Sequence, residues 1–469
     1  MDAEKLKKIK ERFGDPFLET EFPKWFSIKE ILDDFEEGKE ISTAGRLLSK
    51  REHGKSSFAH IGDYSGKLQI YAQLNTLKDK YKLFKELDVG DIVGVKGNFF
   101  VTKTGESTVL VEDLKLLAKV LRPLPEKWHG LKDIEVRYRQ RYLDLISNPS
   151  VKEVFIKRSQ IITLIREFFN RLGYIEVETP MLHSIPGGAS GNPFVTHYNV
   201  HDCDVYLRIA PELYLKRALV GGLDKIYEIN RSFRNEGISV RHSPEFTMLE
   251  AYCAYQNYEY MIKLCEDLFV HLLEKIHSSL IIEYQGKEIN FSPPWQRISF
   301  AEIFKKEFGV EPQDCEKVFL EKIIQKVKLE KGLTRSQILN ITEELIEKNY
   351  PQNKPVFIVD HFKWNSPLAK SKKDNPYLVE RFELFIAGLE VANAYSELND
   401  PIEQRERFQK QLNKDNDFKK IDEDFLLALE YGMPPAAGLG IGIDRLVMLL
   451  LNQPSIKDVI LFPFLKPLS

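Results

Sequence analysis

Two kinds of hydrophobic pattern divide the chain. After a charged, helix-prone start at residues 1–40, short runs of alternating apolar and polar residues follow, with turns between them. Successive side chains of a strand point to opposite faces, so this alternation predicts strands with one buried face. The predicted strands cover residues 41–48, 57–61, 68–74, 92–102 and 109–119. Together with one helical segment, they predict a small Greek-key barrel, the OB-fold, over residues 41–122, preceded by a helical arm over residues 1–40.

Beyond a proline-bearing connector at residues 121–125, the spacing becomes helical. Apolar residues recur every three or four positions over residues 154–172, and Gly173 follows. This pattern is typical of an amphipathic helix that ends at a glycine cap. Residues 299–350 are charged and mostly helical, which predicts an insertion without a site. The chain is therefore expected to be an α+β protein whose second, larger domain spans residues 123–469.

Two predicted strands of the larger domain carry polar side chains on a single face. The residues of this face are Phe246, Met248, Glu250 and Tyr252 in the first strand, and Asn393, Tyr395 and Glu397 in the second. Side chains two residues apart share one face of a strand. A core face would not hold Glu250 unpaired, because burying a lone charge costs on the order of several kcal/mol. The pattern therefore predicts the floor of a pocket that holds a cation.

Cationic side chains precede the first of these strands. Arg234 and Arg241 lie near the two ends of a loop, with His242 beside the second. A guanidinium group presents planar donors that match two carboxylate or phosphate oxygens at once. A glycine-rich loop at residues 186–191 lacks the ending of a Walker loop. Its glycines would instead allow the backbone to approach a ligand closely.

Composition narrows the class of protein. The net charge is −3, so the chain is not a bulk polycation, and binding of nucleic acid would need a local basic patch. Such a patch is expected at Arg46, Lys50, Arg51 and Lys55. The cysteines form no CxxC pair, and we expect them to be reduced. The N-terminus lacks the apolar core of a signal peptide, and residues 439–451 are too charged to span a membrane. We therefore expect a cytoplasmic protein.

The motifs resemble those of class II aminoacyl-tRNA synthetases, and most closely the lysyl-tRNA synthetases. Residues 233–250 resemble motif 2, residues 438–446 resemble motif 3, and residues 154–180 resemble motif 1. The resemblance covers nearly the whole chain. It implies a catalytic domain built on an antiparallel sheet flanked by helices, and a homodimer. It also implies ATP-dependent attachment of lysine to the 3′ end of tRNA(Lys) through a lysyl-adenylate. Asn192 departs from the pattern, since these enzymes usually carry a basic residue there.

The resemblance also implies roles for individual residues. Those expected to bind lysine are Gly188, Glu212, Glu250, Tyr252, Asn393, Tyr395 and Glu397. Those expected to bind ATP are Arg234, Glu236, His242, Phe246, Glu390 and Arg445. Within these sets, Glu212 would take the α-ammonium of lysine, and Phe246 would stack under the adenine. Arg234 and Arg445 would act in catalysis by clamping the α- and γ-phosphates. Glu383 and Glu390 would hold Mg²⁺, which favours one or two carboxylates plus phosphate oxygens.

In the barrel, the resemblance implies recognition of the tRNA anticodon. Phe58 would stack on an anticodon base, a contact worth about 1–3 kcal/mol. Gln69 and Glu106 would read base edges. Tyr71, by contrast, is expected to lie in the barrel core.

Other functions remain open at this point. An aspartyl- or asparaginyl-tRNA synthetase shares the architecture, but its substrate would not suit Glu250 and Glu397 together. A lysyltransferase that acts on a protein lysine would lack the barrel. An inactive, synthetase-like nucleic-acid binder would have damaged ATP motifs, whereas Arg234, Glu390 and Arg445 are all present.

Overall fold

The computed structural model describes residues 3–125, 131–189, 191–328, 338, 342, 347, 350–412 and 420–467. Most residues between 329 and 349, which belong to the expected insertion at residues 299–350, lie outside this part. Ser190 of the glycine-rich loop also lies outside it. The chain divides into two compact units, Met1–Lys152 and Glu153–Ser469. Residues 123–152, which we expected to open the larger domain, are grouped with the first unit.

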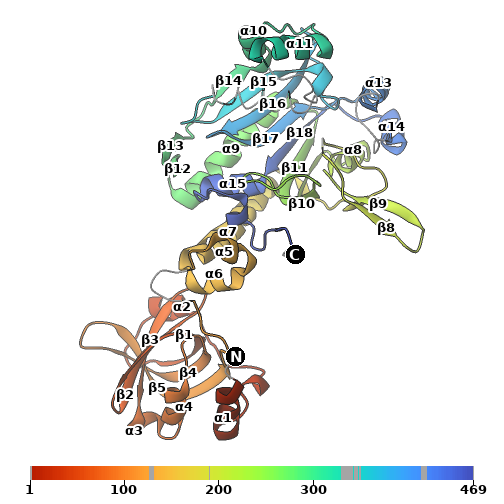
Figure 1. Ribbon diagram of the computed structural model, residues 1–469. Helices are drawn as coiled ribbons and strands as arrows, with labels where there is room; N and C mark the ends of the chain where they lie inside the picture. Colours follow the sequence, from red (N-terminus) through yellow and green to blue (C-terminus); the bar gives the residue numbers. More distant parts are fainter. Residues whose placement is uncertain are drawn as a thin grey trace. The chain divides into compact units, whose positions relative to one another are not determined.

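The first unit is built on a closed barrel with strand order β1-β2-β3-β5-β4 (Figure 1). Its strands are β1 (Glu40–His53), β2 (Ser56–Gly62), β3 (Lys67–Gln73), β4 (Ile92–Val101) and β5 (Ser107–Ala118). Its helices are α1 (Ala3–Phe13), α2 (Ile28–Asp33), α3 (Leu74–Leu77), α4 (Lys80–Glu86), α5 (Ile134–Arg139) and α6 (Arg141–Ser147), with a short 3-10 turn η1 (Pro16–Leu18). The predicted barrel is therefore confirmed, and α1, η1 and α2 lie within the segment expected to form the helical arm.

The alternation along β3 decides which side chains face the barrel core. Leu68, Ile70 and Ala72 are buried, whereas Gln69 and Tyr71 between them are half-buried. The expectation that Tyr71 lies in the core is thus wrong. Tyr71 is on the outer face because it is an odd number of residues from the buried positions.

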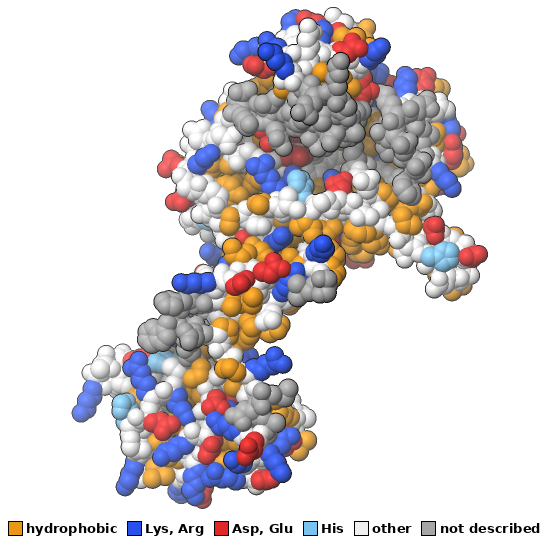
Figure 2. Space-filling view, in the orientation of Figure 1, with side chains coloured by type: hydrophobic (Ala, Val, Ile, Leu, Met, Phe, Trp, Pro, Cys, Tyr) orange, Lys and Arg blue, Asp and Glu red, His pale blue; other side chains and the backbone are white. Residues whose placement is uncertain are grey.

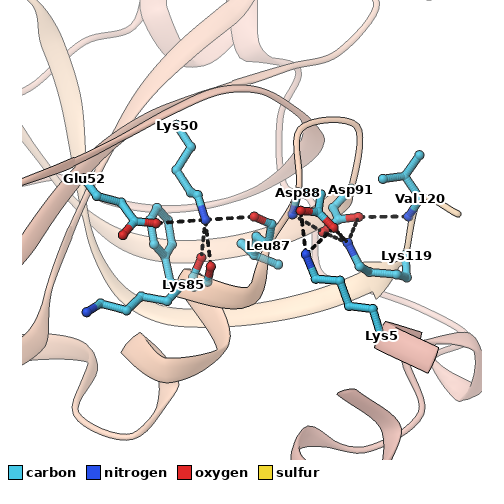
Figure 3. Close-up of polar contacts among 10 residues, drawn as sticks. Lys5, Lys50, Glu52, Lys85, Leu87, Asp88, Asp91, Lys119 and Val120 are labelled. Atoms are coloured by element: carbon cyan, nitrogen blue, oxygen red, sulfur yellow. Dashed lines mark hydrogen bonds and ion pairs between the residues drawn. The ribbon is translucent and has the colours of Figure 1, made fainter. Parts of the chain in front are cut away.

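Ion pairs and hydrogen bonds join the segment between α4 and β4 to the strands of the barrel and to α1 (Figure 3). The buried Nζ of Lys119 lies 2.9 Å from both carboxylate oxygens of Asp91 and 2.5 Å from Asp88. Asp88 also accepts from Lys5 of α1 at 2.6 Å, which ties the helical arm to the barrel. Lys50 donates to the carbonyl oxygens of Lys85 and Leu87, both at 2.8 Å. Since its ammonium is used inside the fold, the expectation that Lys50 belongs to a phosphate-binding patch is not supported.

The second unit is built on an eight-stranded sheet of order β14-β15-β16-β17-β18-β11-β10-β6 (Figure 1). The bounds are β6 (Ile175–Glu176), β10 (Lys225–Phe233), β11 (Glu245–Ala254), β14 (Gln296–Ser299), β15 (Val356–Phe362), β16 (Leu378–Ile386), β17 (Leu389–Ser396) and β18 (Ala436–Gly442). The outermost pairs, β6–β10 and β14–β15, are parallel, and the neighbours between them are antiparallel. The predicted antiparallel sheet is confirmed in the part that carries the site.

Helices and two small sheets surround the large sheet. The helices are α7 (Pro149–Arg171), α8 (Glu212–Val220), α9 (Tyr258–His277), α10 (Phe300–Phe308), α11 (Glu316–Val327), α13 (Pro401–Leu412), α14 (Glu423–Glu430), α15 (Ile443–Leu450) and α16 (Ile456–Val459), with a 3-10 turn η2 (Lys363–Asn365). The small sheets are β7 (Leu182–His183), β9 (Cys203–Leu207) and β8 (Val195–Tyr198), and β12 (Ile281–Tyr284) with β13 (Lys287–Asn290). The buried core joins α7, α9 and α15 to one face of the large sheet. Within the described ranges, no helix is both long and apolar enough to cross a membrane.

The strand β18 fixes the geometry of the other sheet face. It lies between β17 and β11, and its Leu439 and Ile441 are buried in the core. Gly438 and Gly440 alternate with them and turn no side chain toward the opposite face. Gly438 pairs with both Tyr252 and Tyr395. Side chains from two strands that are not neighbours can therefore meet above the glycines.

Candidate active site

One cavity above β18 brings together all the residues predicted to bind lysine and ATP. From these predictions the lining contains Gly188, Glu212, Arg234, Glu236, His242, Phe246, Glu250, Tyr252, Glu390, Asn393, Tyr395, Glu397 and Arg445. They come from the glycine-rich loop before β8, the first turn of α8, the loop before β11, the strands β11 and β17, the residue after β17, and the start of α15. Figure 2 shows side chains of both charges and histidine gathered on the visible face of the larger unit.

One end of the cavity is acidic and buried. Glu212, Glu250 and Glu397 are 5 %, 6 % and 0 % exposed. The hydroxyl of Tyr395 donates to Oε1 of Glu212 at 2.5 Å, and the hydroxyl of Tyr252 donates to Oε2 of Glu250 at 3.2 Å. The carboxylates from α8, β11 and the residue after β17 thus converge on one space. For the two strands, this agrees with the prediction that side chains two residues apart share one face.

The electrostatics of this end favour an added cation. Burial raises the pKa of Glu250 to about 8, and the nearby Glu212 carboxylate adds to the effect. Burial also raises the pKa of Glu397 to about 8, against the opposing effect of the Lys216 ammonium. Burial and the surrounding carboxylates raise the pKa of Tyr252 and Tyr395 well above 10, so both phenols remain hydrogen-bond donors. A bound ammonium group would let both carboxyl groups ionise.

Backbone geometry opens this end to a ligand at Gly188. This glycine has a φ of +86°, and a β-carbon there would lie 3.2 Å from the β-carbon of Glu212. Any side chain would therefore strain the backbone and crowd the carboxylate. Across the cavity, the Oδ1 atom of Asn393 accepts from Nε of Arg381 at 3.2 Å, which fixes the amide orientation.

The other end of the cavity is cationic. The guanidinium of Arg234 lies 5.3 Å from the centre of the Phe246 ring. The Nη1 atom of Arg445 donates to the carbonyl oxygen of Glu390 at 2.7 Å, and its Nη2 atom lies 3.1 Å from Nε2 of His242. Burial and the Arg445 charge lower the pKa of His242, so its Nε2 atom accepts the guanidinium hydrogen. This end suits anionic oxygens beside an aromatic surface.

The two carboxylates predicted to hold Mg²⁺ differ in their surroundings. Glu390 lines the cavity, and its side chain is 43 % exposed. Glu383, on the neighbouring strand β16, pairs with Asn393 of β17, which places Glu383 on the same sheet face as Asn393. It is bound by Nη2 of Arg381 at 2.6 Å and is not among the lining residues. Two carboxylates on one face fit Mg²⁺ when phosphate oxygens complete the shell. Among the described residues, no group of three or more metal-binding side chains is present.

The sequence did not single out several residues that support the site. Asp444 accepts from the backbone N–H of Thr247 at 2.7 Å and pairs with Arg158 of α7 at 2.7 Å, which fixes the start of α15 beside Arg445. Lys216 enters the acidic end from α8. The four-residue spacing from Glu212 was a usable signal for Lys216, whereas no local pattern indicated the partners of Asp444.

In the first unit, the residues predicted to read an anticodon share one outer face of the barrel. The rings of Phe58 and Tyr71 stack with their centres 4.4 Å apart. Nε2 of Gln69 donates to Glu106 at 2.6 Å, and His60 contacts the other oxygen of Glu106 at 3.0 Å. Tyr71 and His60 are thus part of this face, although the sequence did not assign them to it. Aromatic rings beside fixed polar groups suit unpaired bases.

Comparison with known proteins identifies the class. Residues 133–466 match the family model of class II tRNA synthetases of the D, K and N group, and residues 41–117 match that of the OB-fold nucleic acid binding domain. The chain belongs to the class II tRNA synthetases.

The most similar proteins found within this family are lysine–tRNA ligases. One from Carboxydothermus hydrogenoformans is 53 % identical, covering 99 % of this chain and 97 % of its own length. Those from Syntrophomonas wolfei and Pelotomaculum thermopropionicum are 50 % and 52 % identical, each over 99 % of this chain and 96 % and 94 % of their own lengths. The resemblance seen in the sequence is therefore confirmed.

Proposed function

We propose that the protein attaches lysine to the 3′ end of tRNA(Lys) in an ATP-dependent reaction. The observation that carries this assignment is the meeting of Glu212, Glu250 and Glu397 in one buried space beside the cationic end of the cavity. Full-length similarity to lysine–tRNA ligases supports it. The side chains of aspartate and asparagine would place a carboxylate or an amide among buried carboxylates, which is unfavourable.

For lysine, the proposed fit uses opposite charges at each end. The ε-ammonium would lie between Glu250 and Glu397, where Tyr252 and Tyr395 close the pocket. The α-ammonium would pair with Glu212 near the backbone of Gly188. The carboxylate would then point toward Arg234 and the nucleotide. Asn393 would complete the pocket floor.

Activation of lysine needs no protein nucleophile. The lysine carboxylate attacks the α-phosphorus of ATP, forming the lysyl-adenylate, and pyrophosphate leaves. The contribution of this chain is alignment and stabilisation of charge on phosphate oxygens. Arg234 would stabilise the α-phosphate, Arg445 and the neutral His242 the outer phosphates, and Phe246 the adenine face, and Glu236 would also contact ATP. Mg²⁺ held by Glu383 and Glu390 would neutralise phosphate charge during the reaction.

For the second substrate, we assign tRNA recognition to the outer barrel face. Phe58 would stack on an anticodon base, while Gln69 and Glu106 would contact base edges. Lys and Arg side chains, interspersed with acids, cover much of the visible surface of the first unit (Figure 2). They would contribute attraction to phosphates that does not depend on sequence.

A homodimer is the proposed assembly, in the cytoplasm. The elements that resemble motif 1, and the two residues that follow them, expose large apolar side chains: Leu172 is 37 % exposed, Ile175 53 %, Met181 49 % and Leu182 55 %. Exposed large apolar residues are expected where a second protein chain packs. A mass of one chain by sedimentation at micromolar concentration would contradict this assembly.

The deciding experiment is ATP–pyrophosphate exchange with each amino acid in turn. Lysine alone is expected to support rapid exchange, and aspartate-dependent exchange would contradict the assignment. Arg234→Ala and Arg445→Ala should each lower the exchange rate about 100-fold or more, because each removes charge stabilisation from a phosphate group. Near-normal exchange in either variant would remove the role proposed for that residue.

A further inference from the structure

Lys216 is an ammonium group built into the acidic end of the cavity. It lies on α8, one turn after Glu212, and its side chain has 0 % exposure. Its Nζ atom is 2.6 Å from Oε1 of Glu212 and 2.5 Å from Oε2 of Glu397. The same atom lies 5.5 Å from the centre of the Tyr395 ring. Lys216 therefore joins two of the carboxylates to which we assign the substrate.

The charges at this end do not balance without a ligand. Lys216 pairs with Glu212 and Glu397, whereas the cation that lowers the pKa of Glu250 is Arg208. The adjacent Glu228 has its own cation, because Nη1 of Arg208 donates to it at 2.7 Å. When the three carboxylates are ionised, the pocket thus carries a net charge of −2. Lysine brings two ammonium groups, and its carboxylate is directed to Arg234.

We propose that Lys216 is a positioning and specificity residue that holds Glu212 and Glu397 in place and sets the pocket to accept two positive charges. This inference rests on the proposed lysine site. Lys216 does not contact the reacting atoms. It acts through the carboxylates, by occupying one lone pair of Glu212 and one oxygen of Glu397, so that the remaining oxygens face the ligand.

The contacts explain why a lysine can remain charged at a position without solvent. Burial opposes the charge, but the carboxylates of Glu212 and Glu397 outweigh it and raise the pKa of Lys216. The groups in contact with it are Glu212 from the same helix, and Glu397 and Tyr395 from the β17 side. Glu250 of β11 acts electrostatically on Glu397, Tyr395 and Tyr252. Both phenols are neutral, so the carboxylates alone balance the ammonium.

Removal of the Lys216 charge has a defined electrostatic consequence. The ammonium now holds down the pKa of Glu397, against burial. Without it, the carboxyl groups would take up protons at a higher pH, and fewer would be ionised at pH 7. Lysine would then bind only after protons are released, so its affinity would fall at neutral pH and recover as the pH rises.

The test compares Lys216→Met with Lys216→Arg in the full-length protein. The readout is lysine-dependent ATP–pyrophosphate exchange, with the KM for lysine and for ATP measured from pH 6 to 9. For Lys216→Met we expect about a tenfold rise in the KM for lysine at pH 7, and an acid limb of kcat/KM shifted upward by about one pH unit. The KM for ATP should change by less than about twofold, since Arg234 and Arg445 are untouched. Lys216→Arg keeps the charge and should leave the pH limb in place.

Two further variants separate the possible failures. Lys263→Met is the matched control, because Lys263 also pairs with a carboxylate four residues away in a helix, Asp267, but is 67 % exposed. It should not change either readout. Glu397→Gln should raise the KM for lysine if the site itself is correctly assigned.

The outcomes are distinguishable. If Glu397→Gln leaves the KM for lysine unchanged, the proposed lysine site fails. If Glu397→Gln raises it while Lys216→Met lowers thermal stability without moving the KM or the pH limb, Lys216 is merely structural and the inference fails. Should Lys216→Met not fold, the double variant Lys216→Met, Glu397→Gln removes both charges of one pair. An acid limb in the double variant equal to that of Glu397→Gln alone would then overturn the inference.

Discussion

At the scale of single residues, the space above Gly438 determines what the pocket can hold. A β-carbon at this position would overlap Oε1 of Glu397 and lie 2.5 Å from Cε1 of Tyr252. Gly440, two residues further, has more room, because a β-carbon there would lie 3.4 Å from the flexible end of Met248. The two glycines therefore differ in the cost of an added methyl group.

Gly438→Ala should disable lysine binding specifically. The methyl group would displace Glu397 and Tyr252, which costs on the order of 1–3 kcal/mol, or about a 5- to 150-fold rise in the KM for lysine. Gly440→Ala should have a much smaller effect, because the end of Met248 can move. Lysine-dependent exchange with both variants checks this, and equal effects at the two positions would contradict it.

Glu250 should make the stability of the lysine-free protein depend on pH. Its folded pKa of about 8 exceeds the ordinary value of 4.5, so the folded state binds the proton more tightly. The stabilisation is complete below about pH 4.5 and is lost as the pH rises through 8. The Tm of the lysine-free protein should therefore fall between pH 5 and 8 relative to that of Glu250→Gln, which has no carboxyl group to titrate. A constant Tm difference between the two proteins would contradict this.

At the scale of secondary-structure elements, the strands were more predictable than the contacts between them. The period of two in β11 and β17 places Glu250, Tyr252, Tyr395 and Glu397 on the correct face, because strand geometry leaves no alternative. The pairing of both strands with β18 cannot be predicted from the sequence of either strand, since it depends on residues far apart in the chain. Lys216 was missed for the same reason, because its second partner, Glu397, lies on another element.

The ion pairs of Lys119 and Lys5 in the first unit illustrate how burial determines the contribution of an ion pair to stability. Lys119→Met would leave Asp91, which has 0 % exposure, without its cation, and should cost about 3–5 kcal/mol of stability. Lys5→Met removes a cation that is 29 % exposed from the 43 % exposed Asp88, and should cost about 0–1 kcal/mol. Urea unfolding of each variant, followed by circular dichroism, measures the difference. Equal losses would show that Asp91 is reached by water.

At the scale of the whole molecule, the two compact units carry separate proposed recognition sites. The cavity is built entirely from the second unit, whereas the stacked pair Phe58 and Tyr71 belongs to the first. Changes on the barrel face should therefore alter tRNA recognition and leave the activation of lysine unaffected.

Phe58→Ala tests this separation. Loss of one stacking contact should weaken tRNA(Lys) binding by about 1–3 kcal/mol, a rise of about 5- to 150-fold in the KM for tRNA. Lysine-dependent exchange without tRNA should remain at the wild-type rate. Phe100, whose ring lies 5.9 Å from that of Tyr71, offers a milder comparison at the edge of the same face. A slower exchange reaction in Phe58→Ala would contradict the division.

The absence of side chains at Gly438 and Gly440 of β18 has a further consequence for the evolution of substrate specificity. Because Gly438 and Gly440 contribute no side chain, the side chains of the flanking strands β11 and β17 together form one pocket floor. A preference for another amino acid would need matched replacements on the β11 side and on the β17 side. A change on one side alone would leave the carboxylate of the other side without a cationic ligand. Single substitutions should therefore abolish use of lysine far more readily than they redirect the protein to another amino acid.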